Sequence, residues 1–345
     1  MKGAFSSPEG MLEREIFRSL YPDTAYANES GGDPDVIPEL TYEAYLDFHR
    51  TYYHPSNSYI YLYGNMDMEE NLNYIDREYL SEYEDQPVDS GIGLQKPFEA
   101  KREIAVNLPV LEEEDEGAYL TYNVVMGESV DRMLYNAIRI LDYAICSAPG
   151  APLKTALVNA GIGKDVYSTY ENGIRQQFFS IVAKDAKESQ KEEFLSVIRD
   201  VLTDIVTNGF QEKALRAAIS RMEFSYREAD FGSYPKGLAY GLQMLDSWLY
   251  DASKPFIHIE ADETFKKLKE NVNTGYFEGL VEKYLLNNPH GSVVVGVPTP
   301  GLAFKKEQER KEKLAALKAS FSEERIPELV REMQMRIEAE RAALP

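Results

Sequence analysis

The sequence is poor in the residues that form covalent cross-links and thiolate metal sites. It contains one cysteine, Cys146, in 345 residues, so it can form no internal disulfide and offers no cluster of thiolate ligands. The apolar residues before this cysteine favour a buried thiol over a nucleophile. A single thiol also fits a reducing compartment, and we expect a cytoplasmic location.

Long apolar runs and positive charge are also scarce. No stretch of about 18 apolar residues predicts a membrane span, and no basic segment followed by an apolar one indicates a signal peptide. Lysine and arginine number 37 against 58 aspartates and glutamates, which gives a formal net charge of −21. This balance argues against nucleic acid and anionic membrane as partners, and it makes cationic peptides the natural electrostatic counterpart.

The common catalytic motifs are missing. The sequence contains no H-x-x-E-H, no G-x-S-x-G and no G-x-x-x-x-G-K-[ST] pattern,. Zinc ligands on a helix need two histidines four residues apart, whereas His49 and His54 are separated by a predicted helix end. We expect His49 to pack on its helix face, His54 to lie in a turn, and His258 and His290 to have no metal role. No catalytic or metal-ligating residue is therefore assigned in this chain.

The length of the chain predicts more than one core, because 345 residues exceed an ordinary domain,. Residues 86–97 are rich in proline, glycine and aspartate without apolar periodicity, and we interpret them as a linker. We predict the end of a first α+β domain in residues 1–96, a second α+β domain in 97–303, and a helical hairpin in 304–345. The first range contains one convincing strand, and a stable sheet needs about three, so we expect a truncated domain.

The passage from Ser30 to Asn65 has a clear local structure. Gly31 and Gly32 predict a turn, Thr41 is suited to cap a helix, and the tyrosines that follow predict one buried face. Residues 54–57 should stop this helix. Tyr59–Tyr63 alternates aliphatic and aromatic residues and predicts a strand.

The second domain should be an antiparallel sheet with helices on one face. Ser129 is the predicted cap of a helix with an apolar stripe through Leu134, Ile138, Leu141 and Ile145. The acidic run 112–116 should be a solvated loop, and Pro327 suits the first turn of the last helix. The predicted strands cover Lys101–Val110, Ala118–Met126, Val166–Tyr170, Gln176–Lys184 and Ser292–Val297; further predicted helices cover 8–20, 150–161, 194–205, 215–222, 231–248 and 276–286.

Several uncommon short sequence motifs occur in order at compatible spacing. They are Met1–Phe5, Ser30–Pro34, Ile37–Thr41, Phe48-His49, Tyr53–Asn57 and Tyr63–Asn65. In these motifs the chain resembles the insulinase-type (pitrilysin or inverzincin) zinc metallopeptidases, and most closely their presequence-protease branch.

The resemblance implies tandem α+β domains and a zinc endopeptidase that degrades unfolded peptides in a closable chamber. In that family zinc is held by an H-x-x-E-H helix and by a distant glutamate in a short motif that lies just before the position of Met1. The resemblance therefore implies an internal fragment without zinc ligands or activity of its own. The missing N-terminal and C-terminal parts of the parent would be its partners, together with peptide substrates.

The resemblance also implies a peptide-binding strand. In the family, the second-domain strand matching Gln176–Lys184 anchors the N-terminal end of an extended substrate, and β-augmentation would supply the backbone pairing. Gly173 would allow close approach of the peptide. An ordinary strand and hairpin turn is the equally weighted alternative. The candidate peptide-binding residues are Gly173, Gln176, Gln177, Phe178 and Phe179.

Two other functions stay open. A non-catalytic protein of the same architecture could hold peptides or act as a core subunit that scaffolds a complex. An acidic binding module unrelated to peptidases is the third class.

Overall fold

The computed structural model describes residues 7–33, 35–110, 117–229, 231–322 and 324–343. The Met1–Phe5 motif, Pro34 and the acidic run 112–116 lie outside these ranges. Two compact units form, one within residues 1–106 and 116–297 and one within residues 107–115 and 298–345. The domain boundary expected at residue 96 stays a prediction.

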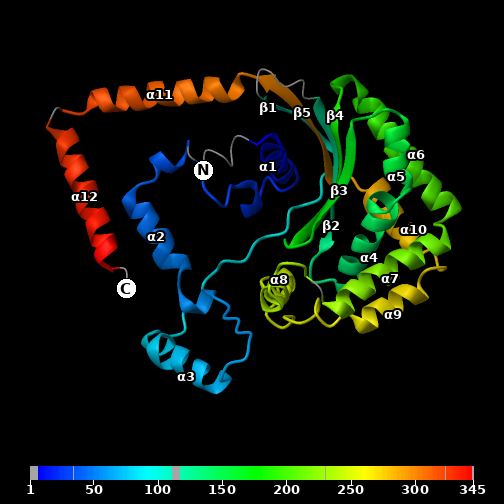
Figure 1. Cartoon of the computed structure of the whole chain (residues 1–345), viewed down its shortest axis with the longest axis horizontal. Coiled ribbons are helices and arrows are strands. Elements are labelled where there is room, and N and C mark those ends of the chain that lie inside the picture. Colours follow the sequence, from blue (N-terminus) through cyan, green and yellow to red (C-terminus); the bar gives the residue numbers. More distant parts are fainter. Residues whose placement is uncertain (1–6, 34, 111–116, 230, 323, 344–345) are drawn as a thin grey trace. The chain divides into compact units, whose positions relative to one another are not determined.

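A five-stranded sheet organises the larger unit, with the strand order β1-β5-β2-β4-β3 (Figure 1). β2 pairs antiparallel with both β4 and β5, and β3 pairs antiparallel with β4. β4 is therefore an interior strand, and β3 is the last strand of the sheet within the described part of the chain. All five strands were predicted: β1 (Arg102–Val110), β2 (Ala118–Glu128), β3 (Asp165–Glu171), β4 (Gln176–Ala186) and β5 (Gly291–Pro300).

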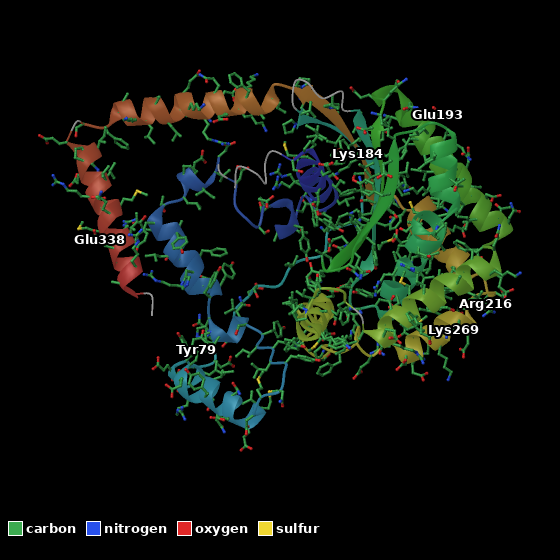
Figure 2. The ribbon with its side chains drawn as sticks, in the orientation of Figure 1. Tyr79, Lys184, Glu193, Arg216, Lys269 and Glu338 are labelled. Atoms are coloured by element: carbon green, nitrogen blue, oxygen red, sulfur yellow. The ribbon has the colours of Figure 1, made fainter. Side chains whose placement is uncertain are left out.

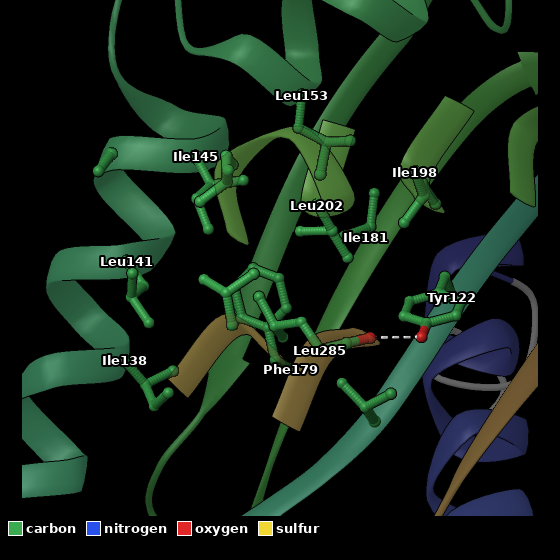
Figure 3. Packing of buried hydrophobic residues seen from close by; sticks show 14 of the residues in the cluster. Tyr122, Ile138, Leu141, Ile145, Leu153, Phe179, Ile181, Ile198, Leu202 and Leu285 are labelled. Atoms are coloured by element: carbon green, nitrogen blue, oxygen red, sulfur yellow. Dashed lines mark hydrogen bonds between the residues drawn. The ribbon is translucent and has the colours of Figure 1, made fainter. Parts of the chain in front are cut away.

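Helices cover one face of this sheet, as predicted, and the main core lies between the two layers (Figure 1). The stripe on α4 is confirmed, because Ile138, Leu141 and Ile145 point toward Phe179 and Ile181 (Figure 3). The helices on this side are α4 (Arg132–Asp142), α5 (Pro152–Asn159), α6 (Lys191–Asn208), α7 (Glu212–Glu228), α9 (Asp262–Glu270) and α10 (Tyr276–Leu280).

Three details of these helices differ from the predictions. Ser129 does not cap α4; Asp131 does, and its carboxylate accepts a hydrogen bond from the backbone N–H of Leu134. The reason is that the backbone N–H of Asp131 bonds to the carbonyl of Glu128, which places a turn before the helix. In addition, α4 and α10 continue into π-helical turns at Tyr143–Ser147 and Val281–Leu286, and α9 was not foreseen.

The opposite face of the sheet carries α1 (Pro8–Leu20), capped by Ser7. Leu12, Ile16 and Leu20 are buried there. Glu9 of α1 accepts hydrogen bonds from Lys184 at 2.6 Å and from the Tyr119 hydroxyl at 2.7 Å; Figure 2 labels Lys184 on its strand. These two donors lower the pKa of Glu9 to about 2.

A buried polar network lies beneath α1. The amide of Asn123 donates to the hydroxyl of Thr121 at 2.8 Å and to the carbonyl of Ser292 at 3.2 Å, and it accepts from the hydroxyl of Ser180 at 2.7 Å. The hydroxyls of Ser19 and Ser292 are 2.7 Å apart. All these side chains are almost inaccessible to solvent, so directional hydrogen bonds as well as apolar contact fix α1 on the sheet.

Residues 36–83 are more exposed than predicted. α2 (Tyr42–Tyr52) begins at Thr41, whose hydroxyl accepts from the N–H of Ala44 as expected. Its apolar face is not buried, however, and Tyr42 is 71% exposed. The predicted strand Tyr59–Tyr63 is also wrong, because no strand among the described residues pairs with it. α3 (Met68–Glu78) follows without a buried residue.

The Tyr59–Tyr63 segment packs instead on α8 (Lys236–Trp248). A Cβ added to Gly237 would lie 2.2 Å from the ring of Tyr63, and one added to Gly241 would lie 2.8 Å from the ring of Tyr61. The aromatic rings therefore occupy the space that side chains would fill on an ordinary helix.

The smaller unit contains α11 (Leu302–Ser320) and α12 (Arg325–Ala343). Both helices were predicted, and Pro327 lies in the first turn of α12. No helix in the described ranges combines the length and apolar character that a membrane crossing requires.

Candidate functional site

The turn between β3 and β4 is built around Gly173. Its backbone N–H donates to the carboxylate of Glu171 at 3.1 Å, and its carbonyl accepts from the hydroxyl of Tyr250 at 3.0 Å. Tyr250 in turn accepts from the hydroxyl of Tyr26 at 3.1 Å. Both backbone polar groups of Gly173 are thus hydrogen-bonded within the chain, and the missing side chain lets neighbouring groups approach the turn closely.

Two carboxylates lie close to Gly173. A Cβ on Gly173 would lie 3.3 Å from an oxygen of Glu171 and 3.4 Å from an oxygen of Asp246 on α8. Burial raises the pKa of Asp246 from 3.8 to about 6, and the negative charge of Glu171 adds to this effect. Burial also raises the pKa of Glu171, and the nearby Glu13 adds to that. The carboxylates of Glu171 and Asp246 are therefore both in surroundings that solvate their negative charge poorly.

Aromatic residues hold Asp246 in position. The Tyr135 hydroxyl on α4 donates to Asp246 at 2.7 Å. The ring of Tyr135 stacks on His258 with the centroids 3.8 Å apart. Burial lowers the pKa of His258 to about 4, so the imidazole is neutral at pH 7 and supplies no positive charge to the acidic pair.

This arrangement suits a positively charged ligand group. A carboxylate whose pKa is raised by burial and by a like charge gains favourable interaction when a cation arrives. Glu171 is the last residue of β3, one of the two edge strands of the described sheet. An amine between Glu171 and Asp246 would therefore be close to unpaired strand backbone, which can bind an extended peptide.

The predicted site residues on β4 do not provide that edge. β4 pairs on both sides, as shown by Phe178 opposite Val125 on β2 and Glu171 on β3. β-Augmentation on Gln176–Lys184 is therefore wrong in its choice of strand, and the sheet edge next to β4 belongs to β3. Gln177, Phe178 and Phe179 are buried: Phe179 belongs to the core, and the Gln177 amide accepts from the Tyr170 hydroxyl at 2.6 Å.

The side-chain amide of Gln176 is hydrogen-bonded to the segment that was predicted as a linker. Its side-chain amide accepts from the N–H of Gln95 at 2.5 Å and donates to the carbonyl of Gln95 at 3.1 Å. Gln95 also forms hydrogen bonds with Asp23. The chain's own backbone thus contacts this amide as an extended peptide would.

The histidines and the cysteine have structural surroundings. His54 lies in a turn and accepts from the N–H of Ser56 at 3.2 Å, as predicted, whereas His49 is exposed and stacks on Tyr53. His290 lies 3.1 Å from the carbonyl of Leu20. Cys146 is buried as predicted, and burial raises the pKa of its thiol.

The described residues do not fit a zinc ion. No group of three or more histidine, cysteine, aspartate or glutamate side chains gathers among them in a geometry that could hold a metal. The acidic pair at Gly173 offers two carboxylates and no histidine, whereas zinc in proteins prefers nitrogen and sulfur donors. No catalytic step through a metal can be derived from these side chains.

Asp246 was not among the candidate residues that the sequence predicted. Glu171 lies two residues before Gly173, which the sequence singled out, but Asp246 lies far along the chain in an amphipathic helix with no motif around it. Only the packing of α8 beside the β3–β4 turn brings the two carboxylates together.

Comparison with known proteins gives a consistent assignment. Residues 39–222 match the family model described as Peptidase M16 inactive domain. The chain is 45% identical over 332 residues to Protein HypA of Clostridium perfringens, covering 96% of this chain and 34% of that protein. It is 34% identical over 341 residues to Presequence protease 1, chloroplastic/mitochondrial, of Arabidopsis thaliana, covering 96% of this chain and 31% of that one.

A solved structure shares the fold. The crystal structure of the peptidase M16 inactive domain from Pseudomonas fluorescens superposes with a TM-score of 0.62 at 19% identity, covering 85% of this chain and 66% of that one. The predicted α+β class is confirmed. The chain spans about a third of the length of the curated relatives it matches.

Proposed function

Because this chain belongs to the peptidase M16 family, as its sequence resemblance to insulinase-type peptidases predicted, we propose that it holds extended peptides for a larger zinc endopeptidase without cleaving them. M16 is a metallopeptidase family, and the matching model is that of its inactive domain. Membership also removes the third class considered above, a binding module unrelated to peptidases.

The acidic pair at Gly173 is the single observation that carries this proposal. Glu171 and Asp246 converge beside Gly173 at the end of β3, one of the two edge strands of the described sheet. A peptide would place its α-amino group or a lysine between the two carboxylates and pair its backbone with β3. Hydrogen bonds to a peptide backbone do not depend on the side chains of the peptide. This suits an enzyme that degrades many unfolded peptides.

The parent would supply the chemistry. By analogy with the family, zinc would activate a water molecule and polarise the scissile carbonyl, with a glutamate as general base. None of those groups is assigned to the present chain, whose role would be peptide anchoring and scaffolding. Its substrates would be unfolded peptides, preferably cationic ones, in view of the net charge of −21.

Peptide binding to the 345-residue chain tests the proposal. A basic ten-residue peptide with a C-terminal fluorophore should bind measurably by fluorescence anisotropy, and acetylation of its amino terminus should weaken binding about tenfold. Glu171→Gln and Asp246→Asn should each weaken binding of the unacetylated peptide by a similar factor. Gly173→Val should do the same, because its side chain would press against both carboxylates.

Glu193→Gln is the matched control, since Glu193 is exposed on α6 and is not part of the Gly173 site (Figure 2). It should leave binding unchanged. Equal affinity for the acetylated and unacetylated peptides, together with wild-type affinity in Glu171→Gln and Asp246→Asn, would disprove the proposed anchoring site.

A non-catalytic core subunit remains the second candidate. The exposed aromatic residues of segment 36–83 favour it, because Tyr42, Tyr45, Phe48 and Tyr53 are each more than half exposed and such patches mark interaction surfaces. The reading frame before Met1 separates the two candidates: an H-x-x-E-H motif there favours the peptidase, and its absence favours the subunit.

A further inference from the structure

A second pocket lies on the helix-covered side of the sheet, away from the turn that carries Gly173. It has a volume of about 260 Å³. Its floor is apolar and is formed by Ile198 and Leu202 of α6, Leu286, and Tyr122 and Val293 of the sheet. Figure 3 shows Tyr122, Ile198 and Leu202 converging from their two layers. The Tyr122 hydroxyl donates to the carbonyl of Leu285 at 2.6 Å, so it is directed into the protein.

Two cationic side chains line the same pocket. Lys101 lies over the ring of Tyr122, with its ammonium nitrogen 5.4 Å from the centroid, and donates to the carbonyl of Asn288 at 2.5 Å. Arg199 comes from α6. Neither cation has a carboxylate partner among the residues that the structure describes. The remaining charged group, Glu103, is paired with Lys191 at 2.7 Å.

The environment of Lys101 is unfavourable for its positive charge. Burial lowers the pKa of Lys101, and the positive charge of Arg199 lowers it further. In a chain with 58 acidic residues against 37 basic ones, two adjacent cations without an acidic partner are conspicuous. An anion between them would relieve their repulsion and would restore the solvation that Lys101 has lost.

We propose that this pocket binds a small organic carboxylate with an apolar body. The carboxylate would lie between Lys101 and Arg199, and the apolar body would contact Ile198, Leu202 and Val293. The pocket is slightly smaller than the roughly 300 Å³ at which drug-sized ligand sites begin, so the fitting ligand is short.

Two sources share this chemistry. One is a free short-chain or medium-chain carboxylic acid, and the other is the C-terminal carboxylate of a peptide that ends in an apolar residue. A bare inorganic anion would satisfy the cations but would leave the apolar floor without a contact.

Calorimetric titration of the 345-residue chain tests the proposal with defined probes. Sodium hexanoate and N-acetyl-alanyl-leucine should be compared with 1-hexanol and with the amide of the same dipeptide. At least one carboxylate should bind with saturation, and its uncharged counterpart should not. Saturation by hexanoate alone identifies the free acid as the source, and saturation by the dipeptide alone identifies the peptide terminus.

Substitution of the cations completes the test. Arg199→Gln should weaken carboxylate binding about tenfold, and Lys101→Gln should have an effect of similar size. Arg199 is exposed, so its replacement leaves the fold intact. Arg221→Gln is the matched control and should change nothing, since Arg221 is an exposed arginine of α7 that lies over the ring of Tyr143.

Three outcomes would overturn the proposal. The first is no saturable binding of either carboxylate, and the second is unchanged binding in Arg199→Gln. The third is equal binding of inorganic phosphate, which would mean that the apolar floor contributes nothing.

Discussion

Asp246 is the side chain whose protonation connects stability with the Gly173 site. Its folded-state pKa of about 6 lies above its ordinary value of 3.8, so between pH 4 and 6 the folded state binds more protons than the unfolded state. Stability contributed by this group therefore falls as the pH rises through this range. The shift from 3.8 to about 6 corresponds to a cost of up to about 3 kcal/mol above pH 6.

Asp246→Asn should remove this cost while keeping an acceptor for the Tyr135 hydroxyl. We expect the variant to be more stable than the wild type at pH 7 by up to about 3 kcal/mol, and nearly equal to it at pH 4. Urea unfolding at pH 4, 5, 6 and 7 measures the difference. A difference that does not change with pH would show that Asp246 titrates normally.

Asn123 is the side chain on which the buried network beneath α1 depends. Asn123→Ala should leave the Ser180 hydroxyl and the Ser292 carbonyl without this partner, and we expect a loss of about 3 kcal/mol in the free energy of unfolding. Asn208→Ala, at an exposed position on α6, is the control and should stay within about 0.5 kcal/mol of the wild type. A loss below 1 kcal/mol for Asn123→Ala would mean that water replaces the amide.

At the scale of the element, helix α8 owes its contact with Tyr59–Tyr63 to two glycines. Replacing glycine by alanine in a helix normally stabilises it by about 1 kcal/mol. Gly241→Ala should instead destabilise the protein, because the new methyl group would lie 2.8 Å from the Tyr61 ring. Because Tyr59–Tyr63 would then pack less tightly on α8, a protease that cleaves after tyrosine should cut this segment faster than in the wild type.

Gly279→Ala in α10 is the matched substitution, since a Cβ there would contact nothing within 4 Å. It should raise the thermal midpoint while Gly241→Ala lowers it. Stabilisation by both substitutions would contradict the packing of Tyr61 on α8.

Most elements of the second domain could be predicted because their patterns are local. The stripe Leu134–Ile138–Leu141 requires one helical period and one buried face, and β4 is a short, mostly apolar run that is buried along most of its length. The strand predicted at Tyr59–Tyr63 failed because a strand needs a partner, which no pattern within five residues reveals. Likewise, the anchoring role expected of Gln176–Phe179 depended on strand order, and sequence alone does not say whether β4 or β3 ends the sheet.

At the scale of the whole molecule, net charge should govern encounter with peptides. With a formal charge of −21, the association rate of a basic peptide should fall about tenfold or more between 50 and 500 mM salt. Stopped-flow fluorescence measures this rate, and a neutral peptide of the same length is the control. A rate independent of salt would exclude electrostatic attraction as the cause of any preference for cationic peptides.

Metal content is the second property of the whole chain that can be measured directly. We expect the purified 345-residue chain to carry far less than one zinc ion per molecule after dialysis, because the donor side chains in its described ranges form no cluster of three or more. Elemental analysis decides this, with the chelator-treated chain as the blank. One tightly bound zinc ion per molecule would contradict the assignment of the metal ligands to another part of the parent.

The family could be recognised from short motifs in the first fifth of the chain. The acidic pair of Glu171 and Asp246 could not be predicted from the sequence. Motifs such as Ser30–Pro34 and Tyr53–Asn57 are contiguous and can be compared directly. Glu171 and Asp246 become neighbours only after α8 has packed beside the β3–β4 turn.

The π-helical turn at Tyr143–Ser147 makes this part of the protein sensitive to the number of its residues. A π turn contains one residue more than an α turn, and this residue rotates everything after it around the helix axis. Removing any one residue there would turn Ile145 and Cys146 away from the core that now surrounds them, even if every remaining side chain were retained. Homologues should therefore vary in composition across this turn while preserving its length.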